Sequence, residues 1–593
     1  MDFRWNLDQL YTSFDSEKFQ KDLEATGELV DKINNWANEN LDTQDNPVAK
    51  MEKFVEFTNE FLDIHGLLIR YCMLIVSADS KNKDGYRYLE KLNKAKADLT
   101  PAQVRFEKWV GNLESLEELI SKSEYLEEHS LFLFELTKDS QYLLSDEEEV
   151  LYAKLTNTGS KAWSKLQNTV TSNLMVDITM DGEEKQLPLP EVRNMAYNGD
   201  QDLRKKAYQA ELDAYSKIEE TSAACLNGIK GEVLTMVDLK GYESPLEEIL
   251  IKQRMERETL DAMLTAMKES LPTFHKYYRK KAELLGHDDG LPFYDLFAPI
   301  GEVDMEYTYQ EARDYIVDNF VSFSQELSDF VSDAFENQWI DAKPRQGKRG
   351  GAFCMNLRSI KESRILTNFN GSFSNMTTLA HELGHAFHGY CLNDESFINC
   401  RYPMPLAETA SIFNETIVTN SALENSNEKE AFSILESTIS GAGQVIVDIY
   451  SRFLFESELF ERRKDHSLSV DELKEIMIDA QKEAYGEGLD HDCLHPYMWL
   501  NKTHYYSAER NFYNYPYAFG LLFAKGLYAE YQKRGDEFVE DYKKLLQATG
   551  KKTIADVAKM ADIDVNSVDF WRSSLEVIKE DIDKFIELAD NLK

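Results

Sequence analysis

The chain has 593 residues, of which 42% are hydrophobic and 29% charged, and its formal net charge is −40. This balance is typical of a folded protein and is too apolar for a disordered one. Because nucleic-acid binding requires a basic surface, so acidic a chain is not expected to have a nucleic-acid partner.

The N-terminal stretch MDFRWNLDQLYTSFDSEKF has no apolar run flanked by basic residues, and no later run of about 18 apolar residues follows. The six cysteines show no CxxC spacing, which argues against a disulfide framework and against a thiolate zinc site. We therefore expect a cytoplasmic protein with no membrane partner.

Apolar residues recur at three- and four-residue spacing over residues 16–166 and again from residue 191 onward, which predicts helices. Between these regions, residues 173–189 alternate apolar and polar side chains around Asp181-Gly182, a pattern typical of a β-hairpin. The fold class predicted is mostly α. We expect an N-terminal helical domain over residues 1–195, ending in the hairpin, and a catalytic domain over residues 196–593.

Residues 343–374 interrupt the second helical region with two short strand-like pieces bounded by glycines. One interpretation is an ordinary surface hairpin. The other is a small sheet directly before the next helix, with a free edge that an extended peptide can pair with.

That next helix carries TTLAHELGHAFH, residues 377–388. His381 and His385 are about 40° apart around an α-helix, so their imidazoles converge on one point. Glu382 lies beside them, where it reaches a metal-bound water without occupying the coordination sphere. The apolar neighbours of these residues predict a buried helix, in which imidazoles and a carboxylate need partners. A metal ion supplies them.

A catalytic zinc site needs a third protein ligand. A metzincin would supply a histidine six residues after His385, where this chain has Cys391, so that class is excluded. The segment PLAETASIFNETI places Glu408 and Glu415 on one face of a helix beginning near two prolines. One of these acids binding the metal and the other anchoring a ligand imidazole would explain two acids in apolar company.

HELGHAFH, followed by Glu408, Ser411 and Glu415 in the pattern E-x-x-S-x-x-x-E, resembles the zinc oligopeptidases of the thimet oligopeptidase and oligoendopeptidase F family. GKRGGAFC and TNFNGSF upstream, and THYYSAERNFYNYPYAFGLLF downstream, extend the resemblance, which is strongest to bacterial oligoendopeptidase F.

The resemblance implies a large helical body around a deep substrate channel, with a small β-sheet beside the HExxH helix in a gluzincin-type core. It implies one zinc ion held by His381, His385 and Glu408, with Glu382 as general base, which leaves Glu415 as the imidazole anchor. Oxyanion donors would be drawn from the following four residues: His504, Tyr513, Tyr515 and Tyr517, with His504, Tyr513 and Tyr517 taken as the catalytic set.

The residues of that aromatic segment point the same way, because so many tyrosine hydroxyls are difficult to satisfy in a simple core helix. An aromatic layer at a domain junction is the structural alternative. His491 and His495 form a rival pair at metal-ligand spacing, but they lack the adjacent glutamate and lie among glycines and a proline, which favours a loop.

The predicted reaction is hydrolysis of internal bonds in short unstructured peptides, with Glu382 taking a proton from the attacking water. One alternative is a zinc metallocarboxypeptidase, for which the basic QGKRGG segment would bind the substrate carboxylate. Another is a catalytically silent peptide-binding scaffold, although the motif residues are intact. We expect a monomer or a small homo-oligomer.

Overall fold

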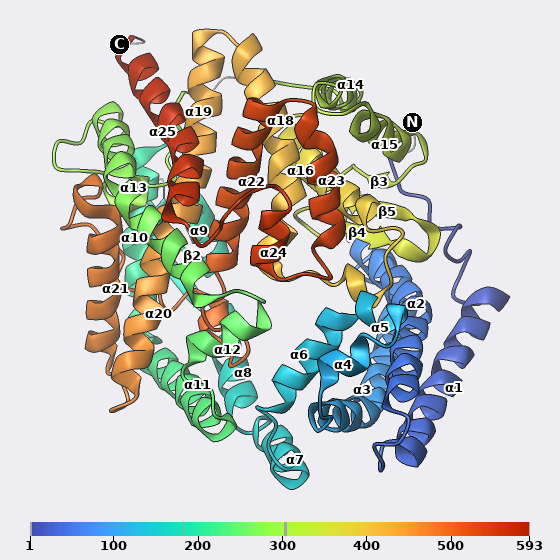
Figure 1. Cartoon of the computed structure of the whole chain (residues 1–593). Coiled ribbons are helices and arrows are strands. Elements are labelled where there is room, and N and C mark those ends of the chain that lie inside the picture. Colours follow the sequence, from blue (N-terminus) through green and yellow to red (C-terminus); the bar gives the residue numbers. More distant parts are fainter. Residues whose placement is uncertain (1–2, 181, 302–304, 592–593) are drawn as a thin grey trace. The chain divides into compact units, whose positions relative to one another are not determined.

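The computed structural model describes residues 3–180, 182–301 and 305–591 (Figure 1). The chain divides into two compact units. The first comprises Met1–Leu143, Asp304–Ser421 and Glu530–Ile563, and the second comprises Leu144–Val303, Ala422–Ala529 and Asp564–Lys593. The predicted domain boundary at residue 195 stays a prediction. Each of the two units gathers segments from distant parts of the chain. The predicted mostly helical fold is confirmed.

The first unit begins with a helical layer and continues with the sheet and the helices around it. Its helices are α1 (Glu17–Asn40), α2 (Pro47–Ala78), α3 (Lys83–Gly111), α4 (Leu116–Ile120), α5 (Glu124–Glu128), α6 (Ser130–Ser140), α14 (Tyr309–Phe320), α15 (Gln325–Glu336), α16 (Phe373–Cys391), α17 (Met404–Ala407), the first part of α18 (Thr409–Asn425), α23 (Glu537–Ala548) and α24 (Ile554–Lys559). Its strands are β3 (Ile340–Asp341), β4 (Phe353–Leu357) and β5 (Glu362–Leu366).

Helices α1, α2 and α3 pack together through aromatic and aliphatic side chains. Ser16 caps α1 by accepting a hydrogen bond from the Phe19 backbone N–H. Phe54 of α2 stacks on Phe106 of α3 with ring centroids 3.8 Å apart. Within the described residues, α2 has the one stretch long and apolar enough to cross a membrane, and half of that stretch is buried inside the protein. A core helix passes the same test, so this is weak evidence for a span.

The small sheet predicted before the histidine helix is present. Its strand order is β3-β5-β4, with β3 and β5 parallel and β4 and β5 antiparallel. The sheet packs against α16 through β4 and β5. Strand β4 therefore lies at the edge of the sheet and next to the helix that carries HExxH.

The second unit is helical apart from one hairpin. Its helices are α7 (Asp146–Leu155), α8 (Ser160–Ser172), α9 (Leu189–Asn194), α10 (Gln201–Tyr215), α11 (Glu219–Lys240), α12 (Pro245–Lys252), α13 (Arg257–Leu284), α19 (Glu428–Gly443), α20 (Ile449–Arg463), α21 (Val470–Tyr485), most of α22 (Tyr515–Arg534) and α25 (Val568–Asn591). The hairpin pairs β1 (Met175–Met180) with β2 (Glu183–Pro188) in antiparallel register.

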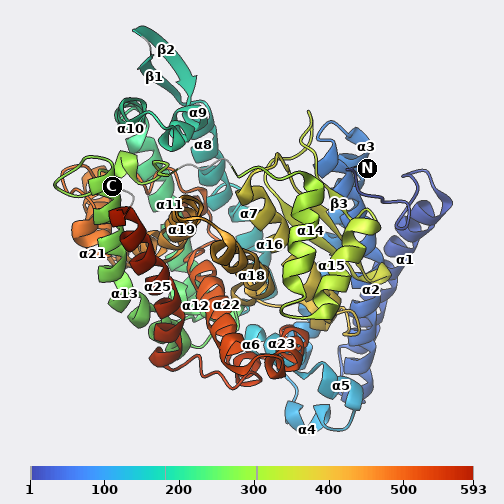
Figure 2. The ribbon, with the colours of Figure 1, turned by 90° about the horizontal axis from the view of Figure 1, so that it is seen from above.

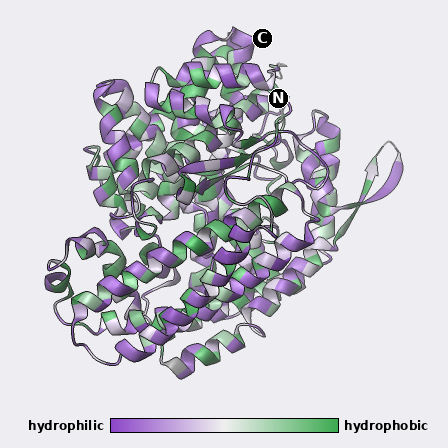
Figure 3. Cartoon of the chain, turned by 90° about the vertical axis from the view of Figure 1, so that its right-hand side faces the viewer, coloured by the Kyte–Doolittle hydropathy of each residue, from purple (hydrophilic) through white to green (hydrophobic). Residues whose placement is uncertain are grey.

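The predicted hairpin is thus confirmed, while Asp181 of its predicted turn lies outside the described residues. The hairpin projects from α9 and α10 (Figure 2). Its β2 strand is the more hydrophilic of the two (Figure 3). The inward residues of β1, Val176 and Ile178, are buried, so one face of the hairpin belongs to the core of the second unit.

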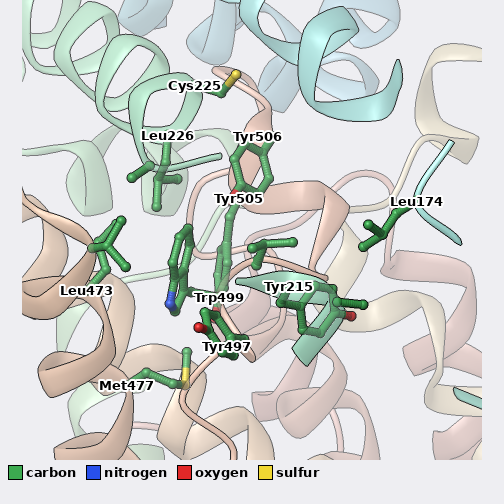
Figure 4. Packing of buried hydrophobic residues seen from close by; sticks show 14 of the residues in the cluster. Leu174, Tyr215, Cys225, Leu226, Leu473, Met477, Tyr497, Trp499, Tyr505 and Tyr506 are labelled. Atoms are coloured by element: carbon green, nitrogen blue, oxygen red, sulfur yellow. The ribbon is translucent and has the colours of Figure 1, made fainter. Parts of the chain in front are cut away.

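The chain segment that precedes α22 contributes side chains to that core. Trp499, Tyr505 and Tyr506 are almost fully buried there and pack with Tyr215, Leu226 and Met477 (Figure 4). Tyr505 and Tyr506 therefore belong to the core of the second unit, and an aromatic layer at a domain junction stays a prediction.

Candidate metal centre

Helix α16 carries the HExxH residues and is largely buried within the first unit. Ser372 caps its N-terminus by accepting a hydrogen bond from the Asn375 backbone N–H. Leu379, Ala380 and Leu383 are fully buried. The burial predicted from the apolar neighbours is present, and it fixes which face of the helix His381 and His385 occupy.

Three donor side chains converge beside this helix: His381, His385 and Glu408. The Glu408 Oε2 atom lies 3.2 Å from His381 Nε2 and 3.4 Å from His385 Nε2. Tetrahedral bonds of about 2.0–2.1 Å to zinc separate neighbouring donor atoms by about 3.3–3.4 Å. Both distances from Glu408 therefore fit a tetrahedral zinc ion, and the donor atoms of all three residues lie within 4.8 Å of one another.

Both imidazoles also contact a second partner. His381 Nδ1 lies 3.2 Å from Glu415 Oε2, and His385 hydrogen-bonds the backbone of Ala407. When Nδ1 carries the proton, Nε2 presents its lone pair to the metal. The predicted position of Glu415 beside a ligand imidazole thus agrees with the geometry, whereas the contact with Ala407 has no signal in the sequence.

The helix expected to carry both acids is broken at Glu408. Helix α17 ends at Ala407 and α18 begins at Thr409, so Glu408 occupies the junction. The Ser411 hydroxyl donates a hydrogen bond of 2.7 Å to Glu408 Oε2. Burial alone would raise the pKa of Glu408, but hydrogen bonds from His381 and Ser411 and the nearby imidazoles lower it to about 2. The carboxylate is therefore held in its charged, metal-binding form.

Gly384 permits this arrangement. A Cβ atom at this position would lie 2.4 Å from the Ala410 carbonyl oxygen and 2.6 Å from Ser411 Cα. Helices α16 and α18 consequently approach each other more closely than any larger residue allows. A glycine inside a predicted helix is the sequence signal for this close approach.

Glu382 lies next to the donor group without joining it. Its side chain is 6% exposed, and among the described residues its Oε2 atom has no hydrogen-bond partner. Burial raises the pKa of Glu382 to about 7, although a hydrogen bond from the Cys354 backbone of β4 opposes the shift. A carboxyl group with a pKa near neutrality both accepts and donates a proton readily.

His388, the third histidine of the motif, has a different environment. It is fully buried, its Nε2 lies 2.9 Å from the Thr549 hydroxyl, and its ring stacks on Tyr402 at 4.2 Å. Burial lowers the pKa of His388 to about 3. His388 therefore joins α16 to the chain segment leading to Glu408 and lies outside the donor group.

The predicted oxyanion donors form a cluster of their own in the second unit. The Tyr517 hydroxyl donates to the Tyr513 hydroxyl at 3.2 Å, and the His504 ring centroid lies 5.7 Å from that of Tyr513. Tyr515 is buried, and its hydroxyl has no hydrogen-bond partner among the described residues. His504, Tyr513 and Tyr517 are thus brought together with each other, and their action on one substrate with Glu382 stays a prediction.

The rival histidine pair does not form a donor group in the part of the chain that the structure describes. His491 is exposed in a loop and hydrogen-bonds the Gly486 carbonyl, whereas His495 is 2% exposed and accepts a hydrogen bond from the Tyr497 backbone N–H. The loop expected for this pair is present.

Comparison with known families decides the class of this centre. Residues 194–577 match the model of peptidase family M3. The chain belongs to this family. Residues 112–175 match a second model, described as Oligopeptidase F. The family predicted from HELGHAFH and the downstream acids is therefore confirmed, and membership in M3 makes the chain a metalloendopeptidase.

Relatives and solved structures agree with this placement. Oligopeptidase PepF of Bacillus subtilis is 26% identical over 99% of this chain and 88% of its own length, and group B oligopeptidase PepB of Streptococcus agalactiae is 24% identical over 99% and 97%. The crystal structure of oligoendopeptidase-F from Enterococcus faecium superposes with a TM-score of 0.71 at 19% identity, covering 97% of this chain and 99% of that one. The M3 fold thus extends over nearly the whole chain.

Proposed function

We propose that this M3 peptidase hydrolyses internal bonds of short unstructured peptides with one zinc ion held by His381, His385 and Glu408. The observation that carries the proposal is the donor spacing of 3.2 and 3.4 Å beside a buried glutamate that does not belong to the donor group. Zinc bound there would supply a Lewis acid that acidifies a water molecule and polarises the peptide carbonyl.

Glu382 would act as the general base and then as the general acid. Its unpartnered Oε2 would take a proton from the attacking water, and the protonated carboxyl would deliver that proton to the leaving amine. Its raised pKa supports both steps, because neither protonation state is strongly favoured near neutral pH. Glu415 would keep His381 oriented while Glu382 changes its charge.

His504, Tyr513 and Tyr517 would donate hydrogen bonds to the carbonyl oxygen as negative charge develops on it. One such donor is typically worth about 3 kcal/mol, or two to three powers of ten in turnover. The hydroxyl pair Tyr513–Tyr517 supports this role, because each phenol positions the other.

The carboxypeptidase alternative requires a free cation that binds the terminal carboxylate of the substrate. In the basic segment, Arg345 binds both oxygens of the buried Asp341 at 2.6 and 2.8 Å, and Lys348 binds the same carboxylate at 2.8 Å. One carboxylate thus pairs with two cations, whereas Arg349 of QGKRGG is exposed. The carboxypeptidase therefore stays an alternative, which the products of cleavage distinguish.

Mass spectrometry of the products from a ladder of unstructured peptides and a folded protein tests the proposal. We expect internal cuts in short peptides only, lost in Glu382→Gln while that variant still binds zinc. Release of single C-terminal residues would favour the carboxypeptidase, and zinc binding without any cleavage would favour the silent scaffold. Action in the cytoplasm and a monomeric or small homo-oligomeric state remain predictions.

A further inference from the structure

The second unit contains a cavity of about 370 Å³ that none of the roles above uses. All of its walls belong to that unit: α9, residues 196–197, α10, residues 293–297, the turn between α19 and α20, and residues 495–502. Aromatic rings, including Tyr208, Phe293 and Tyr294, form part of the wall. A volume of this size accommodates a small organic molecule.

Most charges of the wall are paired. Arg204 binds Asp295 at 2.7 Å, Arg193 lies 3.3 Å from Glu211, and Asp448 accepts a hydrogen bond from Arg452. In each of these three pairs, the positive and the negative charge cancel.

Lys502 is the exception. Lys502 lines the cavity, and among the described residues its ammonium has neither a hydrogen bond nor a carboxylate within ion-pair distance. Burial lowers the pKa of Lys502 to about 8, although the charges of Asp448 and Glu211 oppose the shift. The cavity therefore lacks one negative charge.

Two neutral groups of the wall are also unsatisfied. His495 is 2% exposed, and its Nδ1 accepts the Tyr497 backbone N–H, so its Nε2 carries a proton. That Nε2 lies 3.7 Å from the Glu211 carboxylate, too far for a hydrogen bond, and has no partner in the described chain. The buried Oδ1 of Asn501 likewise has no donor there. Buried polar atoms without partners are uncommon in native proteins.

The backbone at the wall is unusual as well. Gln444–Asp448 forms a π-helical turn between α19 and α20, and both Gln444 and Asp448 line the cavity. Such turns are rare and occur frequently at functional sites, because the extra residue redirects side chains.

We propose that this cavity binds a small organic carboxylate that also bears an N–H or O–H group. The carboxylate would pair with Lys502 and accept a hydrogen bond from His495 Nε2. The donor of the ligand would satisfy Asn501 Oδ1, and the aromatic wall would cover its apolar part. One ligand would thus satisfy the unpaired cation and both unsatisfied neutral atoms.

The test is isothermal titration calorimetry of the zinc-loaded full chain with 4-hydroxybenzoate and with the neutral 4-hydroxybenzamide. We expect saturable binding of the carboxylate and at least about tenfold weaker binding of the amide, because a hydrogen bond to a charged group is lost. Lys502→Met should weaken the carboxylate by about tenfold or more, and Lys502→Arg should largely restore it. Lys206→Met, which removes an exposed lysine from α10, is the matched control and should bind normally.

Asn501→Asp tests the same site if Lys502→Met does not fold, because its new carboxylate would neutralise Lys502 and exclude the ligand. Absence of 4-hydroxybenzoate binding to the wild type would overturn the proposal. So would equal binding of acid and amide, or carboxylate binding that persists unchanged in folded Lys502→Met or Asn501→Asp, since the ligand would then occupy another site such as the metal centre.

Discussion

Replacing Gly384 by alanine tests whether the close approach of α16 and α18 builds the metal centre. The new Cβ atom would meet the Ala410 carbonyl oxygen at 2.4 Å and Ser411 Cα at 2.6 Å. Both contacts are with backbone, so no side-chain rotation relieves them. The helices must separate by about 1 Å to restore ordinary van der Waals distances of about 3.5 Å.

The cost to stability should be modest and the cost to the site large. Overpacking of this kind costs about 1–3 kcal/mol, and the better helix propensity of alanine returns about 1 kcal/mol. Glu408 directly precedes α18, so a shift of that helix lengthens the donor distances of 3.2 and 3.4 Å. A displacement of about 1 Å at a reacting centre costs about 100-fold in rate.

The assay compares zinc affinity, by competition with a chelator, with the rate of peptide cleavage and the unfolding midpoint. Gly27→Ala is the matched control, because Gly27 lies within α1 in the same unit and a Cβ there would meet nothing within 4 Å. That variant should gain up to about 1 kcal/mol and keep full activity. Wild-type zinc affinity and turnover in Gly384→Ala would refute the argument that this helix contact sets the donor geometry.

Three further predictions follow from named contacts. Glu415→Ala should weaken zinc binding by about 10- to 100-fold, because His381 loses the partner of its Nδ1 atom, and unchanged affinity by chelator competition would contradict this. In His504→Gln, the free energy of unfolding should fall less steeply with decreasing pH than in the wild type. Burial, followed by nearby cations, lowers the pKa of His504 to about 3, so the unfolded chain binds the proton first and stability falls as pH drops from about 6.5 toward 3; identical pH slopes of the melting temperature in both proteins would be the contrary result. Lys230→Met should destabilise the second unit by about 3–5 kcal/mol, because it strands the buried Glu456, and adding Glu456→Leu should recover much of this loss in urea unfolding. A double variant no more stable than the single one would oppose that account.

Local chemistry made much of the catalytic helix predictable. The spacing of His381 and His385 fixes their common face on any α-helix, and apolar neighbours require that the face be buried. The alternation around Val176 and Ile178 likewise predicted the hairpin, since a period of two suits only a strand. These inferences need no knowledge of distant contacts.

The details of the donor group depended on distant segments meeting. The parallel strand β3 was not predicted, because its two residues, Ile340 and Asp341, are too few for a periodic signal. The break at Glu408 was missed because the helical spacing continues across it. The charge imbalance around Lys502 appears only when α10, the π-helical turn and the loop carrying His495 enclose one cavity.

The sequence by itself determined the family, the helical class and which side chains can bind zinc, because each depends on residue identity and short-range spacing. Tertiary structure decided which acid faces both imidazoles of the motif, namely Glu408 against His381 and His385. It also decided which group holds each imidazole in place. The physical reason is range: helix geometry relates residues four positions apart, whereas a coordination site requires atoms from separate segments to agree within a few tenths of an ångström.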